Sequence, residues 1–216
     1  MAKITVLGGT GYAGAAVVAE AARRGHEVRA VSRRAPEPAA RIKGVAYLAG
    51  SVTDPVFLES VAGESDAVVS ALSPRGPMLG QVRLVDAELI TLADKLGFRL
   101  GVIVGAGSLL VSPGGPRLVD QPDFPAEVRA ESEEMASVLS DLEASPAGVD
   151  WFGVSPAAGF GAFAPGETLG RYRVGGEVML TDDSGNSYIS AGDLAAAVVD
   201  EVEHPAHRRE RFQVAY

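Results

Sequence analysis

The sequence predicts an α/β fold: a doubly wound parallel sheet with helices on both faces and a small cap near the C-terminus. Short apolar runs alternate with stretches of helical periodicity, which is the pattern of strand and helix units in a parallel sheet. The run Asp66–Leu72 (DAVVSAL) is continuously small and apolar, as expected of a strand covered on both faces. A glycine-rich loop joins the first apolar run to a helix. Together these observations indicate a Rossmann-type architecture.

The first strand, residues 4–7, leads through the glycine-rich loop into a helix over 13–24. Gly8 permits a sharp turn at the strand end, Gly11 lets the backbone approach a pyrophosphate, and Gly14 lets the helix lie close to the strand. The free N–H groups of the first helical turn, with the helix dipole behind them, attract an anion. The loop therefore predicts a dinucleotide-phosphate site made by Gly8, Thr10, Gly11, Tyr12, Ala13 and Gly14.

The second strand, 28–32, ends in Ser32-Arg33-Arg34. In this fold an acidic residue at that tip binds the ribose hydroxyls of NAD, whereas an arginine accepts the 2′-phosphate of NADP. No carboxylate stands there, so the sequence favours NADP, with NAD as the alternative. The competing interpretation is that Arg33 and Arg34 are an ordinary solvated pair.

A third strand spans 45–49, and Asp54-Pro55 marks the start of a helix that Gly63 ends. Asp54 is expected to cap this helix. It also follows the third strand closely enough to reach an adenine amino group. Both roles are open, because they are compatible with each other.

The fourth strand, Asp66–Leu72, should lie beside the first, where the strand order reverses and ligands bind. We expect Ala71, Leu72 and Ser73 to contact the cofactor. The following loop contains Arg75, which either holds a phosphate or an anionic substrate or is a surface arginine. A helix is predicted over 78–96, with Gly97 as its C-cap.

The fifth strand, 100–104, runs into Gly105-Ala106-Gly107-Ser108. A serine at this end of a central strand, flanked by glycine, is expected to point into the crevice. Ser108 is therefore the candidate catalytic hydroxyl, against the alternative of a serine that only stabilises the turn. Gly105 is a further expected cofactor contact.

The rest of the chain is less regular. A long loop over 111–125 should wall the pocket, followed by an acidic helix over 125–142 and a sixth strand over 150–154. Residues 156–190 form the expected substrate-side insertion, with hairpin-like pieces over 170–180 and with Pro156 and Phe160 as substrate contacts. Ser190-x-x-Asp193 predicts a capping box before a helix over 194–202, and 212–215 predicts a last strand.

Composition limits the possible functions. The 216 residues, 47% of them hydrophobic, fit a single domain over 1–216. The net charge of -9 argues against nucleic acid as a partner, and the absence of cysteine excludes disulfides and thiolate chemistry. The three histidines show no metal spacing and are expected to be solvated, so no metal site is predicted. With no long apolar run and no charged leader, we expect a cytoplasmic monomer or homodimer without a membrane partner.

Several motifs together resemble one known group of proteins. They are ITVLGGTGYAG, AVSRR, AGSVTD, DAVVSAL, VIVGAGSL, the DFP segment, WFGVSPAAGF, GRYRVGG and the C-terminal ISAGDLAAAVVDEVEHPAHRRERFQVAY, which cover nearly the whole chain. The chain resembles atypical short-chain dehydrogenases/reductases, specifically the NmrA-like and NADH-flavin-reductase-like NAD(P)H-binding proteins. The resemblance implies a Rossmann domain that binds NADP(H) or NAD(H), in a group often described as flavin reductases or epimerase-like.

One departure from that superfamily matters for the chemistry. Its Tyr-x-x-x-Lys acid–base pair is missing, since no tyrosine here has a lysine four residues later. Alcohol oxidation and sugar epimerisation need such a base, whereas a flavin accepts hydride and takes its proton from water. The sequence thus favours an NADPH-dependent reductase of a flavin, quinone or similar small planar acceptor. The alternatives are a non-catalytic, NmrA-like NADP(H)-binding regulator and an epimerase- or dehydratase-like enzyme.

Overall fold

The computed structural model describes all residues, 1–216, and contains one eight-stranded sheet with the order β3-β2-β1-β4-β5-β6-β8-β7. All neighbouring strands are parallel except the edge strand β7, which is antiparallel to β8. The strands are β1 (Lys3–Leu7), β2 (Glu27–Ser32), β3 (Val45–Ala49), β4 (Ala67–Ser70), β5 (Arg99–Ile103), β6 (Trp151–Ser155), β7 (Arg173–Gly175) and β8 (Glu210–Ala215). The predicted fold class is confirmed.

The strand order reverses at β1, which pairs with β2 on one side and with β4 on the other. Leu7, the last residue of β1, lies opposite Val31 of β2 and Ser70 of β4. The carboxyl ends of these three central strands are therefore level at one edge of the sheet. This edge is the place where open α/β sheets bind ligands.

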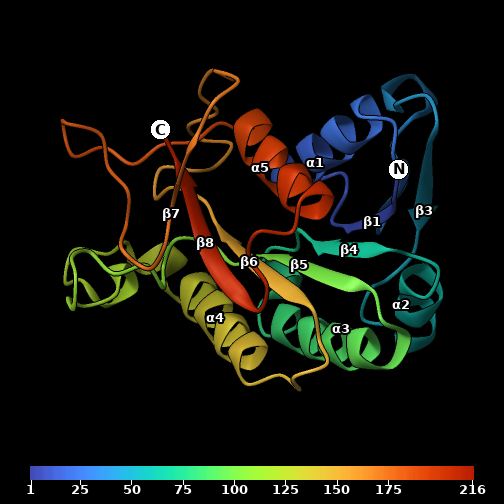
Figure 1. Cartoon of the computed structure of the whole chain (residues 1–216), viewed down its shortest axis with the longest axis horizontal. Coiled ribbons are helices and arrows are strands. Elements are labelled where there is room, and N and C mark those ends of the chain that lie inside the picture. Colours follow the sequence, from blue (N-terminus) through green and yellow to red (C-terminus); the bar gives the residue numbers. More distant parts are fainter.

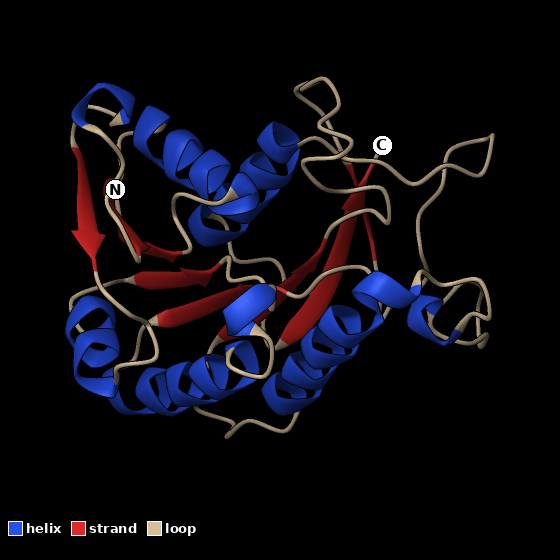
Figure 2. Cartoon of the chain, turned by 180° about the vertical axis from the view of Figure 1, so that it is seen from behind, coloured by secondary structure: helices blue, strands red, loops and turns tan.

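Helices cover both faces of the sheet (Figures 1 and 2). On one face α1 (Tyr12–Arg23) packs against α5 (Ala191–Glu203), and the opposite face carries α2 (Pro55–Ala62), α3 (Val82–Leu96) and α4 (Ala126–Glu143). Each layer encloses its own apolar core, one around Phe152 and one around Trp151. None of the helices combines the length and the apolar composition that a membrane-spanning helix needs.

The third helix begins later than its periodicity predicts. Residues Gly76–Met78 form a short 3-10 helix, and Gly80 has a φ of 76°, a left-handed conformation that interrupts a helical path. As a result α3 starts at Val82 instead of residue 78. Its end is as predicted, because Gly97 adopts the left-handed C-cap conformation.

The predicted capping box is only half formed. Ser190 caps α5 by accepting from the N–H of Asp193 at 3.1 Å. The Asp193 carboxylate does not return a bond to the Ser190 N–H, which donates to the Tyr216 hydroxyl instead. Asp193 accepts from the N–H groups of Leu169 and Gly170 and so fastens the substrate-side insertion to α5.

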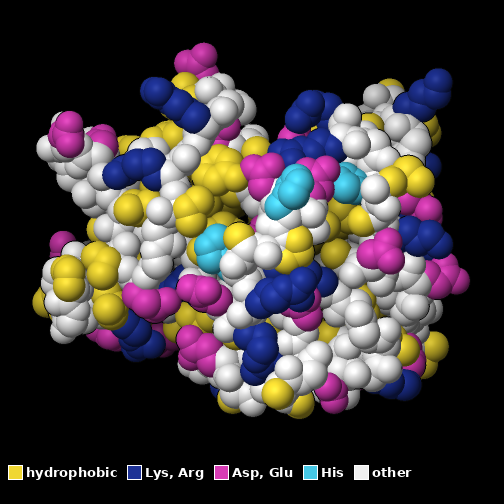
Figure 3. All heavy atoms as spheres, viewed as in Figure 1, with side chains coloured by type: hydrophobic (Ala, Val, Ile, Leu, Met, Phe, Trp, Pro, Cys, Tyr) yellow, Lys and Arg dark blue, Asp and Glu magenta, His cyan; other side chains and the backbone are white.

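Two further expectations, about the hairpin-like pieces and the histidines, are wrong. The extended piece β7 does not form a hairpin with its neighbours in sequence but pairs with β8 at the end of the chain. Two histidines are not simply solvated: His26 Nε2 lies 3.0 Å from Glu203, and His207 Nδ1 lies 2.7 Å from Glu201. Figure 3 shows the histidine side chains close to acidic ones on one face of the molecule. They take part in polar clusters near the end of α5, away from the carboxyl edge of β1.

Candidate functional site

The glycine loop has the geometry that its spacing predicts. Gly8 has a φ of 74°, and a Cβ there would lie 2.7 Å from the carbonyl oxygen of Ala71. A Cβ on Gly14 would lie 2.2 Å from the carbonyl oxygen of Gly8, so only glycine lets α1 approach the end of β1 so closely. Gly11 is the N-cap residue of α1, and no side chain caps this helix. Its first N–H groups are thus available to a phosphate, and the loop fits a dinucleotide.

A cleft of about 810 Å³ opens at the carboxyl edge of β1, β2 and β4, a volume typical of ligand sites. The structure brings together there many of the residues that the sequence assigned to the cofactor and its surroundings. These are Gly8, Thr10, Gly11, Arg33, Arg34, Ala71, Leu72, Ser73 and Arg75. Tyr12, Ala13 and Gly14 belong to the first turn of α1 beside it.

Five other residues line the cleft and were not predicted: Val31, Ser32, Gly50, Val52 and Met78. Ser32 ends β2 and Gly50 directly follows β3, so the rule that ligands bind at carboxyl ends was a usable signal for both. Met78 enters from the 3-10 helix after β4. No pattern in the sequence indicated that this side chain faces the cleft.

The arginine tip of β2 is positioned for an anion. Arg33 and Arg34 are both exposed and line the cleft, and neither guanidinium forms an ion pair with a carboxylate of the protein. Ser32 stabilises the turn by donating its hydroxyl to the carbonyl oxygen of Arg34 at 2.8 Å. Two free guanidinium groups at this tip fit a 2′-phosphate.

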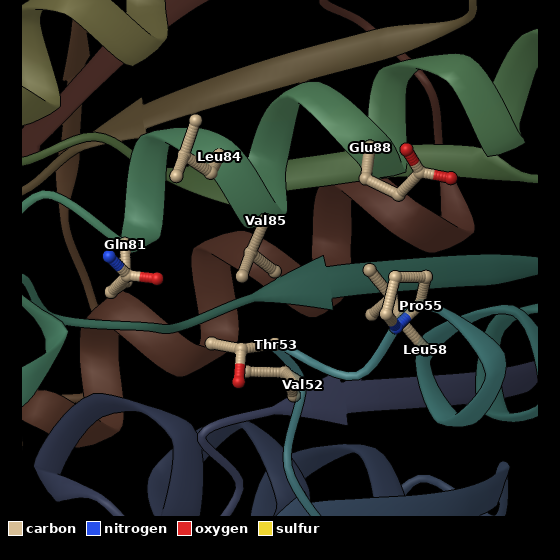
Figure 4. Close-up of a pocket in the computed structure, with 8 residues that line it drawn as sticks. All are labelled: Val52, Thr53, Pro55, Leu58, Gln81, Leu84, Val85 and Glu88. Atoms are coloured by element: carbon tan, nitrogen blue, oxygen red, sulfur yellow. The ribbon is translucent and has the colours of Figure 1, made fainter.

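Asp54 caps α2 as predicted. One of its carboxylate oxygens, Oδ1, accepts from the N–H of Val56 at 3.0 Å and from that of Phe57 at 3.4 Å. Its contact with adenine stays a prediction. A second, smaller pocket of about 200 Å³ lies next to it between α2 and α3 (Figure 4). Val52 lines this pocket and the large cleft.

Arg75, in the loop after β4, forms an ion pair with a glutamate of α4. Its Nε lies 2.9 Å from Glu131, although the arginine side chain is largely exposed. On the same helix, the Glu134 carboxylate accepts from the N–H groups of Gly80 at 2.6 Å and Arg83 at 3.0 Å. Acidic residues of α4 therefore hold the segment between β4 and α3 over the cleft.

A buried carboxyl group lies beneath this edge. Asp86 of α3 is 1% exposed and lies beside Ser70, the last residue of β4, yet neither side chain has a hydrogen-bond partner within the protein. Burial raises the pKa of Asp86 to about 7, against the opposing effect of the neighbouring Ser70 hydroxyl, and the negative charge of Glu134 adds a smaller rise. Its apolar neighbours in sequence gave no sign of this group, because buried aspartates are rare in amphipathic helices.

The predicted acceptor-side residues Ser108, Pro156 and Phe160 do not line the large cleft, and neither does Gly105, whose expected cofactor contact stays a prediction. Gly105 has a φ of 73° and turns the chain after β5, and Ser108 is 9% exposed. The ring centroids of Tyr12 and Phe160 lie 5.2 Å apart, and the Tyr12 hydroxyl donates to the carbonyl oxygen of Pro165 at 3.2 Å. The start of α1 thus contacts the insertion. Pro156 is buried directly after β6. The substrate roles of these residues stay predictions.

Comparison with known proteins agrees with this geometry. A family model described as NAD(P)H-binding matches residues 8–205. YwnB of Bacillus subtilis, an uncharacterised protein, is 39% identical over 217 residues, covering 98% of this chain and 97% of YwnB.

Two solved structures are similar over nearly their whole length. A proposed epimerase from Bacteroides thetaiotaomicron is 34% identical, with 99% of this chain and 96% of that chain covered and a TM-score of 0.88. A proposed NADH-flavin reductase from Streptococcus pneumoniae is 32% identical, with 100% and 99% covered and a TM-score of 0.81. The glycine loop, the reversal of strand order and the family match over 8–205 agree with one another. The chain therefore belongs to the NAD(P)H-binding family of atypical short-chain dehydrogenases/reductases.

Proposed function

We propose that this protein is an NADPH-dependent reductase of a small planar acceptor, such as a flavin or a quinone. The observation that carries the proposal is the cleft at the switch point, which joins the glycine loop to the two unpaired arginines. When bound, the reduced nicotinamide supplies a hydride. The protein has to bind the dinucleotide, orient it and position the acceptor.

Different residues of the cleft bind different parts of the dinucleotide. The uncapped first turn of α1 binds the pyrophosphate, and Gly11 leaves room for it. Arg33 and Arg34 bind the 2′-phosphate that distinguishes NADPH from NADH. Ala71, Leu72 and Ser73 follow β4 and cover the dinucleotide from the other side of the switch point.

The residues on the acceptor side favour a planar acceptor that needs no acid from the protein. The paired rings of Tyr12 and Phe160 offer an aromatic surface beside the phosphate loop. The hydroxyl of Tyr12 already donates to Pro165, and that of Tyr172 contacts Asp200. Neither tyrosine is arranged as an acid beside a lysine. An acceptor that takes hydride without a strong protein acid, as flavins and quinones do, suits this site better than a ketone or a sugar.

The similarity to the proposed NADH-flavin reductase of Streptococcus pneumoniae supports this choice of acceptor. The missing Tyr-x-x-x-Lys pair also favours a second candidate, a protein that binds NADP(H) as a regulatory signal without turnover. The similarity to a proposed epimerase supports a third candidate, an epimerase-like enzyme. The missing Tyr-x-x-x-Lys pair argues against this candidate.

The test is NADPH oxidation by the purified protein with FMN, FAD and menadione, compared with simple ketones, alongside NADPH affinity from calorimetry. The proposal expects turnover with the planar acceptors and none with ketones. Ser108→Ala should slow turnover about five- to a hundredfold, the loss of one hydrogen bond, without abolishing it. Tight NADPH binding with no turnover above the blank rate would replace the reductase with the regulator. Efficient oxidation of a secondary alcohol with NADP would contradict the argument from the missing pair.

A further inference from the structure

A buried arginine lies against the candidate catalytic serine. Arg211 of β8 has a side chain that is 2% exposed. Its Nη1 lies 3.3 Å from the hydroxyl oxygen of Ser108 and 3.2 Å from that of Ser155. Its Nε lies 3.0 Å from Glu177, whose other carboxylate oxygen contacts Nη2. The guanidinium therefore joins the loop after β5, the end of β6 and the substrate-side insertion.

The sheet explains how the guanidinium comes to this place. Phe212 and Val214 of β8 point into the core beneath α1 and α5, so Arg211 points to the opposite face. It lies opposite Gly153 of β6, which has no side chain in the way. From there it reaches Ser155 at the carboxyl end of β6 and Ser108 beyond the carboxyl end of β5. This is the edge at which the fold binds its ligands.

The hydrogen bonds to the two serines have a fixed direction. A guanidinium has only donors, so the oxygen atoms of Ser108 and Ser155 must accept. The proton of the Ser108 hydroxyl is then free to be donated to another group. A bond from a buried cation also draws electron density from the hydroxyl oxygen and makes that O–H a better donor.

The two halves of the ion pair differ in burial. Arg211 is enclosed by the protein, whereas the side chain of Glu177 is 60% exposed and belongs to the irregular insertion. Glu177 contacts Nε and Nη2 only. Nη1 therefore keeps its hydrogen atoms for Ser108 and Ser155.

We propose that Arg211 is a positioning residue that holds Ser108 as a hydrogen-bond donor toward the acceptor. This inference rests on the proposed reductase function. As the acceptor takes a hydride with its electron pair from the reduced dinucleotide, negative charge develops on an acceptor oxygen or nitrogen. Ser108 donates a hydrogen bond to that atom and keeps its own proton, and water supplies the proton that completes the reduced acceptor. A cation beside a hydroxyl replaces, in chemical terms, the tyrosine–lysine pair that the sequence lacks.

The experiment uses menadione, whose carbonyl groups report hydrogen bonds. The first readout is kcat with NADPH, and the second is the infrared carbonyl band of menadione bound to the protein without turnover. A donated hydrogen bond lowers the frequency of this band. Arg211→Gln should lower kcat about five- to fiftyfold, with little change in the NADPH dissociation constant, and should move the band to its position in Ser108→Ala. In a Ser108→Ala background Arg211→Gln should have no further effect on either readout.

Arg99→Gln is the matched control. Arg99 is also a buried arginine, paired with Glu201 at 2.6 Å, but it lies at the start of β5, at the opposite edge of the sheet. Its substitution should lower the melting temperature and leave the carbonyl band of bound menadione unchanged. Ser155→Ala is a milder second variant, which removes one anchor of the guanidinium and should shift the band part of the way.

The possible outcomes separate the two proposals. If the wild type neither binds nor reduces menadione or a flavin, the reductase function itself fails. If the wild type reduces menadione and Arg211→Gln keeps the wild-type rate and band, only the role of Arg211 fails. Should Arg211→Gln not fold, wild-type values of both readouts in Ser155→Ala would overturn the proposal. Additive losses in the double variant with Ser108→Ala would overturn it as well.

Discussion

The dinucleotide half of the molecule and the acceptor half are built differently. In the first, residues 1–80, four parallel strands and two α-helices follow one another with one long connection, between β2 and β3, and the cleft lies where β1, β2 and β4 end. In the second, residues 105–190, two long irregular stretches are joined by isolated bridges, such as Leu110 to Val178, and the three-residue strand β7 pairs with β8. Four large apolar side chains are exposed in this half, Phe163, Leu169, Val174 and Tyr188.

The difference shows which parts of a site are encoded locally. A phosphate loop consists of consecutive residues whose backbone forms the binding surface, so its chemistry can be recognised from spacing. The acceptor side consists of side chains from distant segments, so its chemistry depends on the packing of the whole fold.

The largest effect is expected in the glycine loop. Gly11→Val should reduce NADPH binding in calorimetry below detection while the melting temperature stays near wild type, because a Cβ at Gly11 meets only the carbonyl oxygen of Gly8, at 3.2 Å. Gly14→Ala should instead lower the free energy of unfolding by roughly 1–3 kcal/mol, since its Cβ would clash with backbone. Equal NADPH binding by Gly11→Val and the wild type would remove the case for a phosphate loop.

The second prediction concerns the carboxyl group buried under the cleft. Burial raises the pKa of Asp86 to about 7, so the folded state holds a proton that the unfolded state releases near pH 4. The folded state binds more protons between these values, and stability falls as the pH rises from about 4 to about 7. Asp86→Asn should remove this loss, which amounts to at most about 4 kcal/mol at about 1.4 kcal/mol per pKa unit.

Denaturant unfolding at pH 5 and pH 8 measures this effect. The stability of Asp86→Asn relative to the wild type should be higher at pH 8 than at pH 5. Asp94→Asn, which changes an exposed carboxylate on the same helix, should show no such difference. Parallel pH profiles of Asp86→Asn and the wild type would mean that Asp86 is ionised in the folded protein throughout this range.

The third prediction concerns cofactor choice. A charge-assisted hydrogen bond from Arg33 to the 2′-phosphate is worth roughly 1.5–3 kcal/mol, so NADPH should bind about ten- to a hundredfold more tightly than NADH. Arg33→Ala should remove most of that preference by weakening NADPH and leaving NADH unchanged. Fluorescence titration of both dinucleotides measures it. Tighter binding of NADH by the wild type would identify the two arginines as ordinary surface charge.

The smallest effect is expected at Arg75. If it holds a phosphate, Arg75→Ala should weaken NADPH binding severalfold, while its exposed pair with Glu131 contributes at most about 1 kcal/mol to stability. Arg83→Ala is the matched control, because Arg83 forms a similar exposed pair with Asp141 of α4 and does not line the cleft. Equal NADPH affinities of the two variants would mean that Arg75 only links the loop after β4 to α4.

The sequence by itself determined the fold class, the phosphate loop and the arginine tip. Apolar runs predict buried strands, and glycine spacing reports backbone geometry that no other residue can adopt, as the close approach of Gly14 to Gly8 demonstrates. Asp54 and Gly97 predict helix ends because a cap acts on the backbone next to it. Each of these signals acts on residues that are close to it in the sequence.

The tertiary structure alone decided the partners of distant polar groups. Ser108 and Arg211 are 103 positions apart, and nothing near either residue predicts their contact. The same is true of Ser190, whose N–H donates to the hydroxyl of Tyr216 from the end of the chain in place of the expected Asp193 carboxylate. A buried polar group takes whichever partner the packing brings within hydrogen-bond distance, because leaving it unpaired is costly, and packing is a property of the whole sheet.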